Sequence, residues 1–162
     1  MKHLKLFEKF DTSRKKMKKK RKKKLHFLSG IALIVDNRIL MVNAQKHSEY
    51  GDKWSIPKGH IEGGDSLISA LQELREESGV ILDYNYDEVF QYTYKKSGFN
   101  KLMDVYVYRK SKQDVEKYLD GWNISRDYLD EEEIIEASFL TLQEATDCID
   151  ITMIDLIDLI GI

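Results

Sequence analysis

The segment that most constrains this chain is residues 59 to 80, GHIEGGDSLISALQELREESGV, where a glycine-rich loop leads into a helical pattern ending at Gly79. Glu73, Glu76 and Glu77 are spaced i, i+3 and i+4, so they share one face of a helix with 3.6 residues per turn. Like charges gathered on one turn repel one another unless a cation neutralises them. A divalent cation that prefers oxygen ligands suits this arrangement best.

An acidic helix face also occurs on ordinary surface helices, where water and salt absorb the repulsion. The acidic run alone is therefore a weak indication of a metal site. The flanking residues strengthen it, because Pro57-Lys58-Gly59 precedes the loop, Gly63-Gly64-Asp65 lies within it and Gly79 follows the helix. A solvated acidic helix has no need of this ordered set of turn residues.

The whole segment resembles the Nudix box, G-x5-E-x7-R-E-U-x-E-E-x-G-U, in which U is an aliphatic residue. Gly59 opens the box, and the run from Glu73 to Val80 completes it. Asp65 replaces the first Glu of the pattern, and Gln72 replaces its Arg. Six residues separate these two positions instead of seven, which predicts a tighter loop and leaves the register of the three glutamates unchanged. The missing Arg removes a family ion pair that orients the helix, and this bears on efficiency more than on activity.

The resemblance implies an enzyme that uses Mg²⁺ or Mn²⁺ to hydrolyse a diphosphate linkage, with the following site residues. Glu73 and Glu77 are expected to be metal ligands, and Glu76 either a ligand or the group that deprotonates water. The main-chain carbonyl of Gly59 is expected to be a further ligand, since a glycine lets the main chain approach an ion closely. The metal would neutralise the phosphate oxygens and activate the water.

Two further residues are candidates on position alone. Lys58, next to the box, could hold a substrate phosphate as a point charge, although an exposed lysine needs no function. Glu133 belongs to the acidic run 130 to 133 before the last predicted strand, where Nudix enzymes often supply another catalytic acid. A solvated acidic loop is the alternative for Glu133.

The segment before the box carries the indication of substrate. KHSEYGDKWSIPKGHIE is close to the W-x-x-P-K-G-x-x-E pattern of many Nudix proteins, and His60 makes it most like that of diadenosine-polyphosphate hydrolases. A dinucleoside polyphosphate is therefore the favoured substrate. RNA 5′-end pyrophosphohydrolases or decapping enzymes and inositol-pyrophosphate hydrolases carry similar segments and stay as alternatives. A nucleotide- or RNA-binding sensor without turnover is the non-enzymatic alternative, but loss of the box glutamates normally marks that role.

The resemblance also implies the architecture, an α+β fold in which a mixed sheet lies between helices as an α/β/α sandwich. Alternating and helical apolar patterns place the elements along the chain. Strands are expected at 28–35, 38–44, 87–94, 101–109 and 135–141, and helices at 66–78, 112–120 and from 142 onward.

Charge is divided sharply along the chain. Residues 1–24 contain 13 Lys/Arg and 2 Asp/Glu, whereas residues 25–162 contain 13 Lys/Arg and 26 Asp/Glu. We expect residues 1–24 to be a flexible basic segment and residues 25–162 to form the Nudix domain. The basic run could attract RNA or another polyanion, dock onto an acidic surface, or continue as a helix into the first strand.

Composition favours a single cytoplasmic domain without membrane contact. The chain has 162 residues, 42% of them apolar, which suits one domain of ordinary size. Its one cysteine, Cys148, allows no internal disulfide. No run of 18 apolar residues and no signal-like apolar stretch is present in the sequence.

Overall fold

The sheet that organises the chain is mixed, as predicted. The computed structural model describes residues 25–44, 54–134 and 136–161. In this part of the chain nine strands form one sheet in the order β5-β6-β1-β2-β9-β8-β7, with β3 paired to β2 and β4 paired to β1. β1 and β6 run parallel, while the other paired strands are antiparallel. The strands are β1 Leu25–Val35, β2 Arg38–Asn43, β3 Trp54–Ser55, β4 Lys58–His60, β5 Glu88–Lys96, β6 Phe99–Lys110, β7 Leu119–Asp120, β8 Asn123–Ile124 and β9 Glu136–Thr141.

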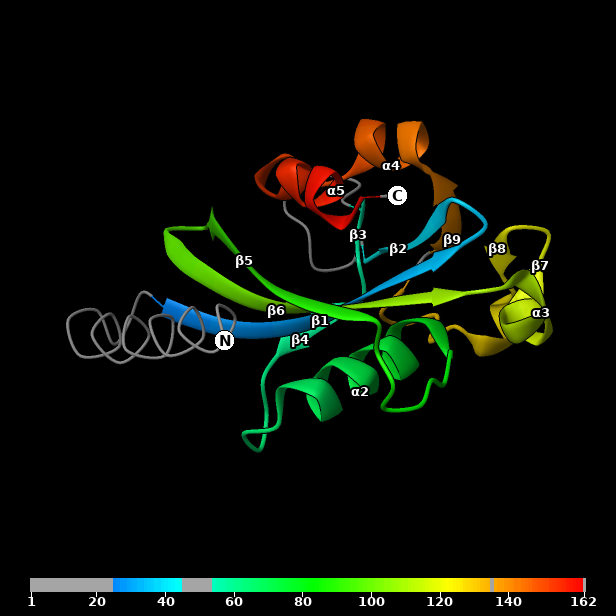
Figure 1. Ribbon diagram of the computed structural model, residues 1–162, viewed down its shortest axis with the longest axis horizontal. Helices are drawn as coiled ribbons and strands as arrows, with labels where there is room; N and C mark the ends of the chain where they lie inside the picture. The colour runs from blue at the N-terminus through cyan, green and yellow to red at the C-terminus, as the bar shows by residue number, and fades with distance from the viewer. Residues whose placement is uncertain (1–24, 45–53, 135, 162) are drawn as a thin grey trace.

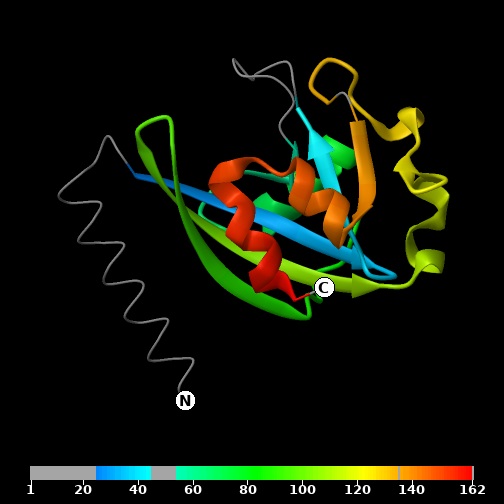
Figure 2. The same ribbon diagram turned by 90° about the horizontal axis from the view of Figure 1, so that it is seen from above.

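Helices cover both faces of this sheet. Figure 1 shows α2 below the sheet and α4 and α5 above it, and Figure 2 shows α5 crossing over β1. The predicted α+β sandwich is therefore confirmed. The helices are α2 Ser66–Ser78, α3 Lys112–Val115, α4 Leu142–Cys148 and α5 Ile154–Ile160, with short 3-10 helices η2 Glu116–Tyr118, η3 Arg126–Tyr128 and η4 Ile151–Met153.

Two tight hairpins set the register of the central strands. Asp36 and Asn37 join β1 to β2 with φ angles of 48° and 61°, and Ser97 and Gly98 join β5 to β6 with φ angles of 53° and 78°. Two-residue hairpin loops favour positive φ at both positions, because that twist matches the flanking strands. The second turn uses only two residues, so β5 and β6 extend further toward each other than the sequence predicted.

One predicted element was wrong over part of its length. The helix expected at 112–120 is a single turn, α3, followed by η2 and then by the short strand β7. β7 pairs with β8 across a turn at Gly121, whose φ is 63°, and the strand pairing ends the helix. Four strands, β3, β4, β7 and β8, were not predicted because two or three residues show no alternation.

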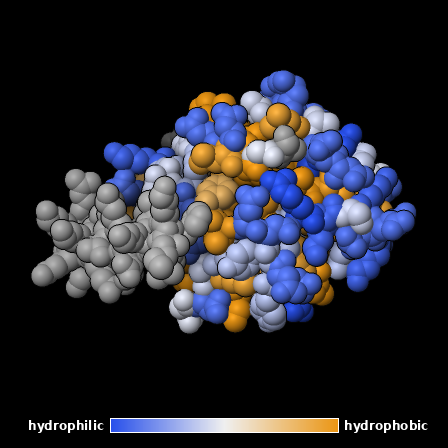
Figure 3. Space-filling view, in the orientation of Figure 1, coloured by the Kyte–Doolittle hydropathy of each residue, from blue (hydrophilic) through white to orange (hydrophobic). Residues whose placement is uncertain are grey.

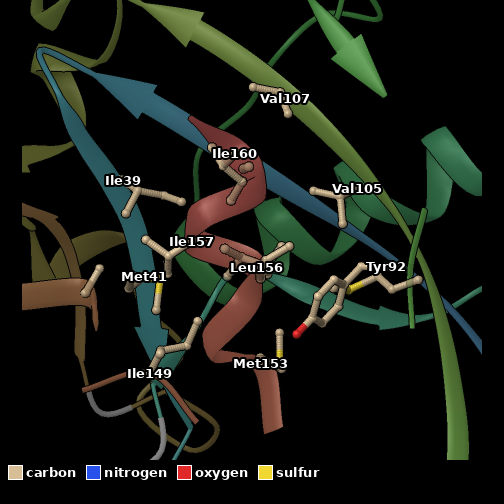
Figure 4. Packing of buried hydrophobic residues seen from close by; sticks show 14 of the residues in the cluster. Ile39, Met41, Tyr92, Val105, Val107, Ile149, Met153, Leu156, Ile157 and Ile160 are labelled. Carbon is tan, nitrogen blue, oxygen red and sulfur yellow. The ribbon is translucent and has the colours of Figure 1, made fainter. Parts of the chain in front are cut away.

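The apolar core has two parts, one on each face of the sheet. Alternate residues of β1 divide between them, since successive side chains of a strand point to opposite faces. Figure 4 shows the part between the sheet and α5, where Leu156, Ile157 and Ile160 belong to one cluster with Ile39 and Met41 of β2. The part under α2 contains the buried residues Ile31, Leu33, Val35, Leu40, Val42, Ala70, Leu74, Val80, Tyr106, Tyr108, Val115, Tyr118, Ile124, Ala137 and Phe139.

The apolar C-terminal helix packs on the sheet. Leu156, Ile157 and Ile160 of α5 are buried there. None of the helices in the described ranges is long and apolar enough to cross a bilayer. On the face drawn in Figure 3, apolar side chains are interspersed with hydrophilic ones.

Candidate active site

The orientation of α2 is fixed at its first turn. Asp65, at the position of the first Glu in the box, is the N-cap, and its Oδ1 accepts a hydrogen bond from the main-chain N–H of Ile68 at 2.9 Å. Ser66 Oγ donates to Asp104 Oδ2 of β6 at 2.6 Å. Buried Leu74 then holds the helix against the sheet. These contacts turn the opposite edge of α2, with its glutamates, toward β4.

Two of the three glutamates meet the main chain of β4. The side chain of Glu73 lies directly against Gly59, where a Cβ would overlap its carboxylate. Glu77 Oε1 accepts a hydrogen bond from the main-chain N–H of Lys58 at 3.4 Å. Both carboxylates are partly buried. The expected neighbours Lys58, Gly59, Glu73 and Glu77 therefore come together in the structure.

Burial raises the pKa values of these carboxylates. It raises the pKa of Glu77 to about 8; the charge of Lys58 opposes this rise, and the charge of Glu73 adds to it. Burial also raises the pKa of Glu73, whose carboxylate shares a hydrogen bond with Glu77. Two adjacent carboxylates repel each other when both are ionised. A divalent cation bound between them would offset that repulsion and replace the proton.

The donor set fits a hard divalent cation. Carboxylate and main-chain carbonyl oxygens are the ligands that Mg²⁺ and Mn²⁺ prefer. The absence of a side chain at Gly59 leaves Glu73 lying against the main chain, so carboxylate and carbonyl ligands can share one ion. Across residues 25–44, 54–134 and 136–161, no three Asp, Glu, His or Cys side chains form a ready-made cluster. A set that includes main-chain oxygen does not need such a cluster.

Glu76 differs from the other two glutamates. It is exposed on α2, and its Oε1 accepts a hydrogen bond from Gln72 Nε2 at 3.0 Å. Gln72 stands where the family pattern has Arg, so a neutral amide one turn earlier now contacts this carboxylate. Glu76 therefore lies on the same helix as the partly buried Glu73 and Glu77 but is exposed to solvent.

Glu133 lies in the turn that precedes β9. It is exposed, and its main-chain N–H donates to the carbonyl of Asp130 at 3.1 Å. In the described ranges no hydrogen bond joins its carboxylate to the glutamates of α2. Its catalytic role stays a prediction.

Asp104 is a buried acid in contact with the start of α2 that the sequence did not lead us to expect. It is buried on β6, and Gln91 Nε2 donates to its Oδ1 at 3.0 Å while Ser66 donates to its other oxygen. An acid in the middle of the apolar run LMDVYVY was the available signal, because a buried carboxylate requires hydrogen-bond donors. The loop before α2 is held similarly, since Ser69 and Glu62 exchange side-chain and main-chain hydrogen bonds at 3.0 and 3.1 Å.

A cavity of about 330 Å³ lies elsewhere on the sheet, at the end of the β5–β6 hairpin. None of the box glutamates lines it. It is therefore separate from the carboxylate site. Its lining residues are Leu25, Thr93, Tyr94, Lys95, Asn100, Lys101 and Leu102.

Comparison with known proteins assigns the family. The family model of the NUDIX domain matches residues 25–159. Comparison with curated proteins finds no match. The chain therefore belongs to the NUDIX domain family.

Solved structures confirm the fold at low sequence identity. The MutT protein from Methanosarcina mazei superposes with a TM-score of 0.63 at 14% identity, over 85% of this chain and 94% of that one. A Caenorhabditis elegans Ap4A hydrolase binary complex gives 0.58 at 16% identity, over 82% and 93%. The NUDIX domain of Shewanella oneidensis NrtR, complexed with ADP ribose, gives 0.59 at 16% identity, over 85% of each chain. At such identities the similarity shows a shared fold and nothing about substrate.

Proposed function

We propose that this protein is a Mg²⁺- or Mn²⁺-dependent hydrolase that cleaves a diphosphate linkage in a nucleoside diphosphate joined to another group. A dinucleoside polyphosphate resembling diadenosine tetraphosphate is the favoured substrate. The observation that carries the proposal is the packing of two partly buried carboxylates, Glu73 and Glu77, against the main chain of β4 at Lys58 and Gly59.

Each residue of this arrangement has a distinct role in the proposal. Glu73, Glu77 and the carbonyl of Gly59 hold the cation. Glu76, the exposed neighbour, either adds a ligand or accepts the proton of the attacking water, and Glu133 is an additional acid in the same reaction. When bound, the cation neutralises phosphate oxygens and lowers the pKa of a coordinated water.

Lys58 is suited to hold the phosphate that is being attacked. Burial lowers the pKa of Lys58, while the carboxylate of Glu77 raises it. When protonated, Lys58 would offer a point charge to a phosphate oxygen. That charge would offset the negative charge on the oxygens of the attacked phosphate.

The substrate preference draws on the sequence and on one structural relative. The W-x-x-P-K-G-H segment resembles that of diadenosine-polyphosphate hydrolases, and a nematode Ap4A hydrolase shares the fold. RNA 5′ ends are the second candidate, because the basic residues 1–24 could attract a polyanion. That segment lies outside the described residues.

A substrate panel tests the proposal directly. The full chain is incubated with Mg²⁺ and, separately, diadenosine tetraphosphate, ADP-ribose, capped RNA and an inositol pyrophosphate, and the products are separated by ion exchange. We expect the fastest release of product from diadenosine tetraphosphate and none from any substrate with Glu77→Gln. Binding of a nucleotide without any product from the wild-type chain would instead support the sensor alternative.

A further inference from the structure

β5 forms one edge of the sheet. Among the described residues it pairs with β6 alone, and Figure 2 shows it along the outer side of the sheet. The strand at the opposite edge, β7, has two residues, whereas β5 has nine. The outer side of an edge strand presents main-chain N–H and C=O groups that another strand can bind. A nine-residue edge offers many of these groups, and a two-residue edge offers few.

β5 lacks the features that usually prevent an edge strand from pairing. Its register with β6 runs without a break from the Glu88–Val107 pair to the Lys96–Phe99 pair, so no bulge twists the edge away. The strand contains no proline. Its centre is rich in β-branched and aromatic residues, which favour extended structure. These residues are Val89, Phe90, Tyr92, Thr93 and Tyr94.

The two faces of β5 are covered unequally. Tyr92 and Tyr94 are buried and belong to the core under α5. Val89 lies on the other face, where 47% of its surface is exposed, and Thr93 and Lys95 are exposed beside it. An additional strand at this edge would extend the core on one face and cover Val89 on the other.

Charge is ordered along β5 from acidic to basic. Asp87 and Glu88 stand at its start, and Lys95 and Lys96 end it. A two-fold axis brings the same edge of two copies together in the antiparallel direction, since each residue i then meets residue j of the other copy and j meets i. The acidic end of each copy therefore meets the basic end of the other. Exposed ion pairs contribute little energy, so this complementarity serves mainly to favour one direction and one register.

We propose that β5 pairs with β5 of a second copy of this chain, antiparallel and with the two-fold axis at Tyr92, so that two sheets become one continuous sheet. This register uses all nine residues of the strand. It sets no like charges opposite each other, and it brings an aromatic pair together on the α5 face. The opposed residues are Glu88 and Lys96, Val89 and Lys95, Phe90 and Tyr94, Gln91 and Thr93, and Tyr92 with its own copy.

The mass of the full chain in solution tests the pairing. Sedimentation equilibrium should give twice the 19.0 kDa of one chain. The dimer should persist in about 0.5 M KCl, where salt screens most attraction between exposed charges, including any between residues 1–24 of one copy and an acidic surface of the other. A mass of 19.0 kDa at the highest soluble concentration would overturn the proposal and leave the edge to another occupant, such as residues 1–24. Association that disappears in KCl would also overturn it.

A charge placed on the exposed face of β5 tests whether this edge makes the contact. Val89→Lys should raise the dissociation constant of the dimer about tenfold in about 0.1 M KCl, because the new ammonium lies opposite Lys95 of the other copy twice across the axis. Leu142→Lys is the matched control, since Leu142 is 43% exposed and lies on α4. It should leave the dissociation constant unchanged, and thermal melts followed by circular dichroism verify that both variants fold. No rise for Val89→Lys, or the same rise in the control, would overturn the proposal.

A second change tests the register. Val89→Lys combined with Lys95→Glu should return the dissociation constant to within about threefold of the wild type, because opposite charges then face each other across the axis. Within one chain the two positions are about 20 Å apart along the strand, so they attract each other only between copies. A double variant that dimerises as weakly as Val89→Lys alone would overturn the pairing centred on Tyr92.

Discussion

Gly59 of β4 and Glu73 of α2 are in such close contact that a side chain on the glycine would overlap the carboxylate. The strand and the helix are therefore fitted to each other at the residue that opens the box. The need for glycine at this position is steric, because its neighbour is the end of a proposed metal ligand. Any side chain there must displace Glu73, shift α2, or do both.

Gly59→Ala should therefore lower kcat about 100-fold, since a displacement of about 1 Å in a catalytic group can have an effect of that size. Steady-state hydrolysis of diadenosine tetraphosphate measures the loss. Gly121→Ala is the control, because a Cβ there meets nothing within 4 Å although its φ is 63°. That variant should lose some thermal stability and keep full activity. Comparable kcat values for the two variants would contradict a specific effect on Glu73.

Glu77 should make the metal-free protein less stable as pH rises. Burial raises the pKa of Glu77 from 4.5 to about 8. The charge of Glu73 adds to this rise, and the charge of Lys58 opposes it. Between these values the folded protein holds a proton that the unfolded chain has released, so the free energy of unfolding falls as pH increases. Glu77→Gln should fold, abolish turnover and flatten this slope. Urea unfolding in EDTA at several pH values measures it, and an unaltered slope in the variant would assign the dependence to another group.

The same carboxylate should couple metal binding to pH. A cation replaces the proton shared by Glu73 and Glu77, so Mg²⁺ competes less with protons at high pH. The rise in melting temperature on adding Mg²⁺ should be larger at pH 8 than at pH 6. Glu77→Gln should show little rise at either pH. A rise that is the same at both pH values in the wild type would contradict a site built on these protonated carboxylates.

Lys96 and Asp150 form the ion pair that joins the β5–β6 hairpin to η4. Burial alone would raise the pKa of Asp150, but the ammonium of Lys96 and the N–H and hydroxyl of Thr152 outweigh it and hold the pKa at about 2. The resulting stability is present above the ordinary value of 3.8 and is lost as pH falls toward 2. Lys96→Met should reduce the free energy of unfolding by about 2 kcal/mol at neutral pH.

A double-mutant cycle with Asp150→Asn isolates the energy of this pair. Urea unfolding at pH 7 should give a coupling between the two changes that shrinks at pH 3, where Asp150 begins to protonate. Lys95→Met is the control for charge, since Lys95 is the exposed neighbour. Additive effects of Lys96→Met and Asp150→Asn at neutral pH would show that the two residues act independently.

The basic residues 1–24 give a prediction that concerns substrate size. Their removal should leave hydrolysis of diadenosine tetraphosphate nearly unchanged, and should weaken action on a capped RNA and lower its salt dependence, because phosphate contacts release counterions. KM values measured over a range of KCl concentrations test this. Equal losses on both substrates would show that the segment supports the fold.

Local patterns explain how much of the fold was predictable from the sequence. The helical apolar pattern predicted α2, and the alternating apolar residues predicted β1 and β2, because each signal lies within a few residues. β4 was not predicted, since three residues show no alternation. Its pairing with β1 places Gly59 and the side chain of Lys58 on opposite faces of the sheet. The closeness of the box glutamates to Lys58 and Gly59 was therefore anticipated from the sequence, and their roles stay a prediction.

Contacts between distant residues lay beyond the sequence pattern. Lys101 meets His26 across a separation of 75 residues, and Lys96 meets Asp150 across 54. Each depends on the register of strands or the placing of a helix, which propensity does not encode. Asp104 shows an intermediate case, because its place in an apolar strand indicated a buried acid but not its donors. The contact between Gln72 and Glu76 was within reach, since i and i+4 residues of a helix are neighbours.

Gln72→Arg should raise kcat/KM modestly, by about threefold, because a charged donor to Glu76 strengthens the hydrogen bond that the amide now makes at 3.0 Å. Both side chains are exposed, so solvent limits the gain. Gln72→Ala should lower kcat/KM, since Glu76 then loses its donor, and thermal stability should change little in either variant. Hydrolysis of diadenosine tetraphosphate at two salt concentrations provides the measurement. A gain that disappears at high salt would fit an ion pair between the new Arg and Glu76. Equal rates for Gln72→Arg, the wild type and Gln72→Ala would show that Glu76 needs no neighbour to hold it. The shortened loop would then already set the position of the helix.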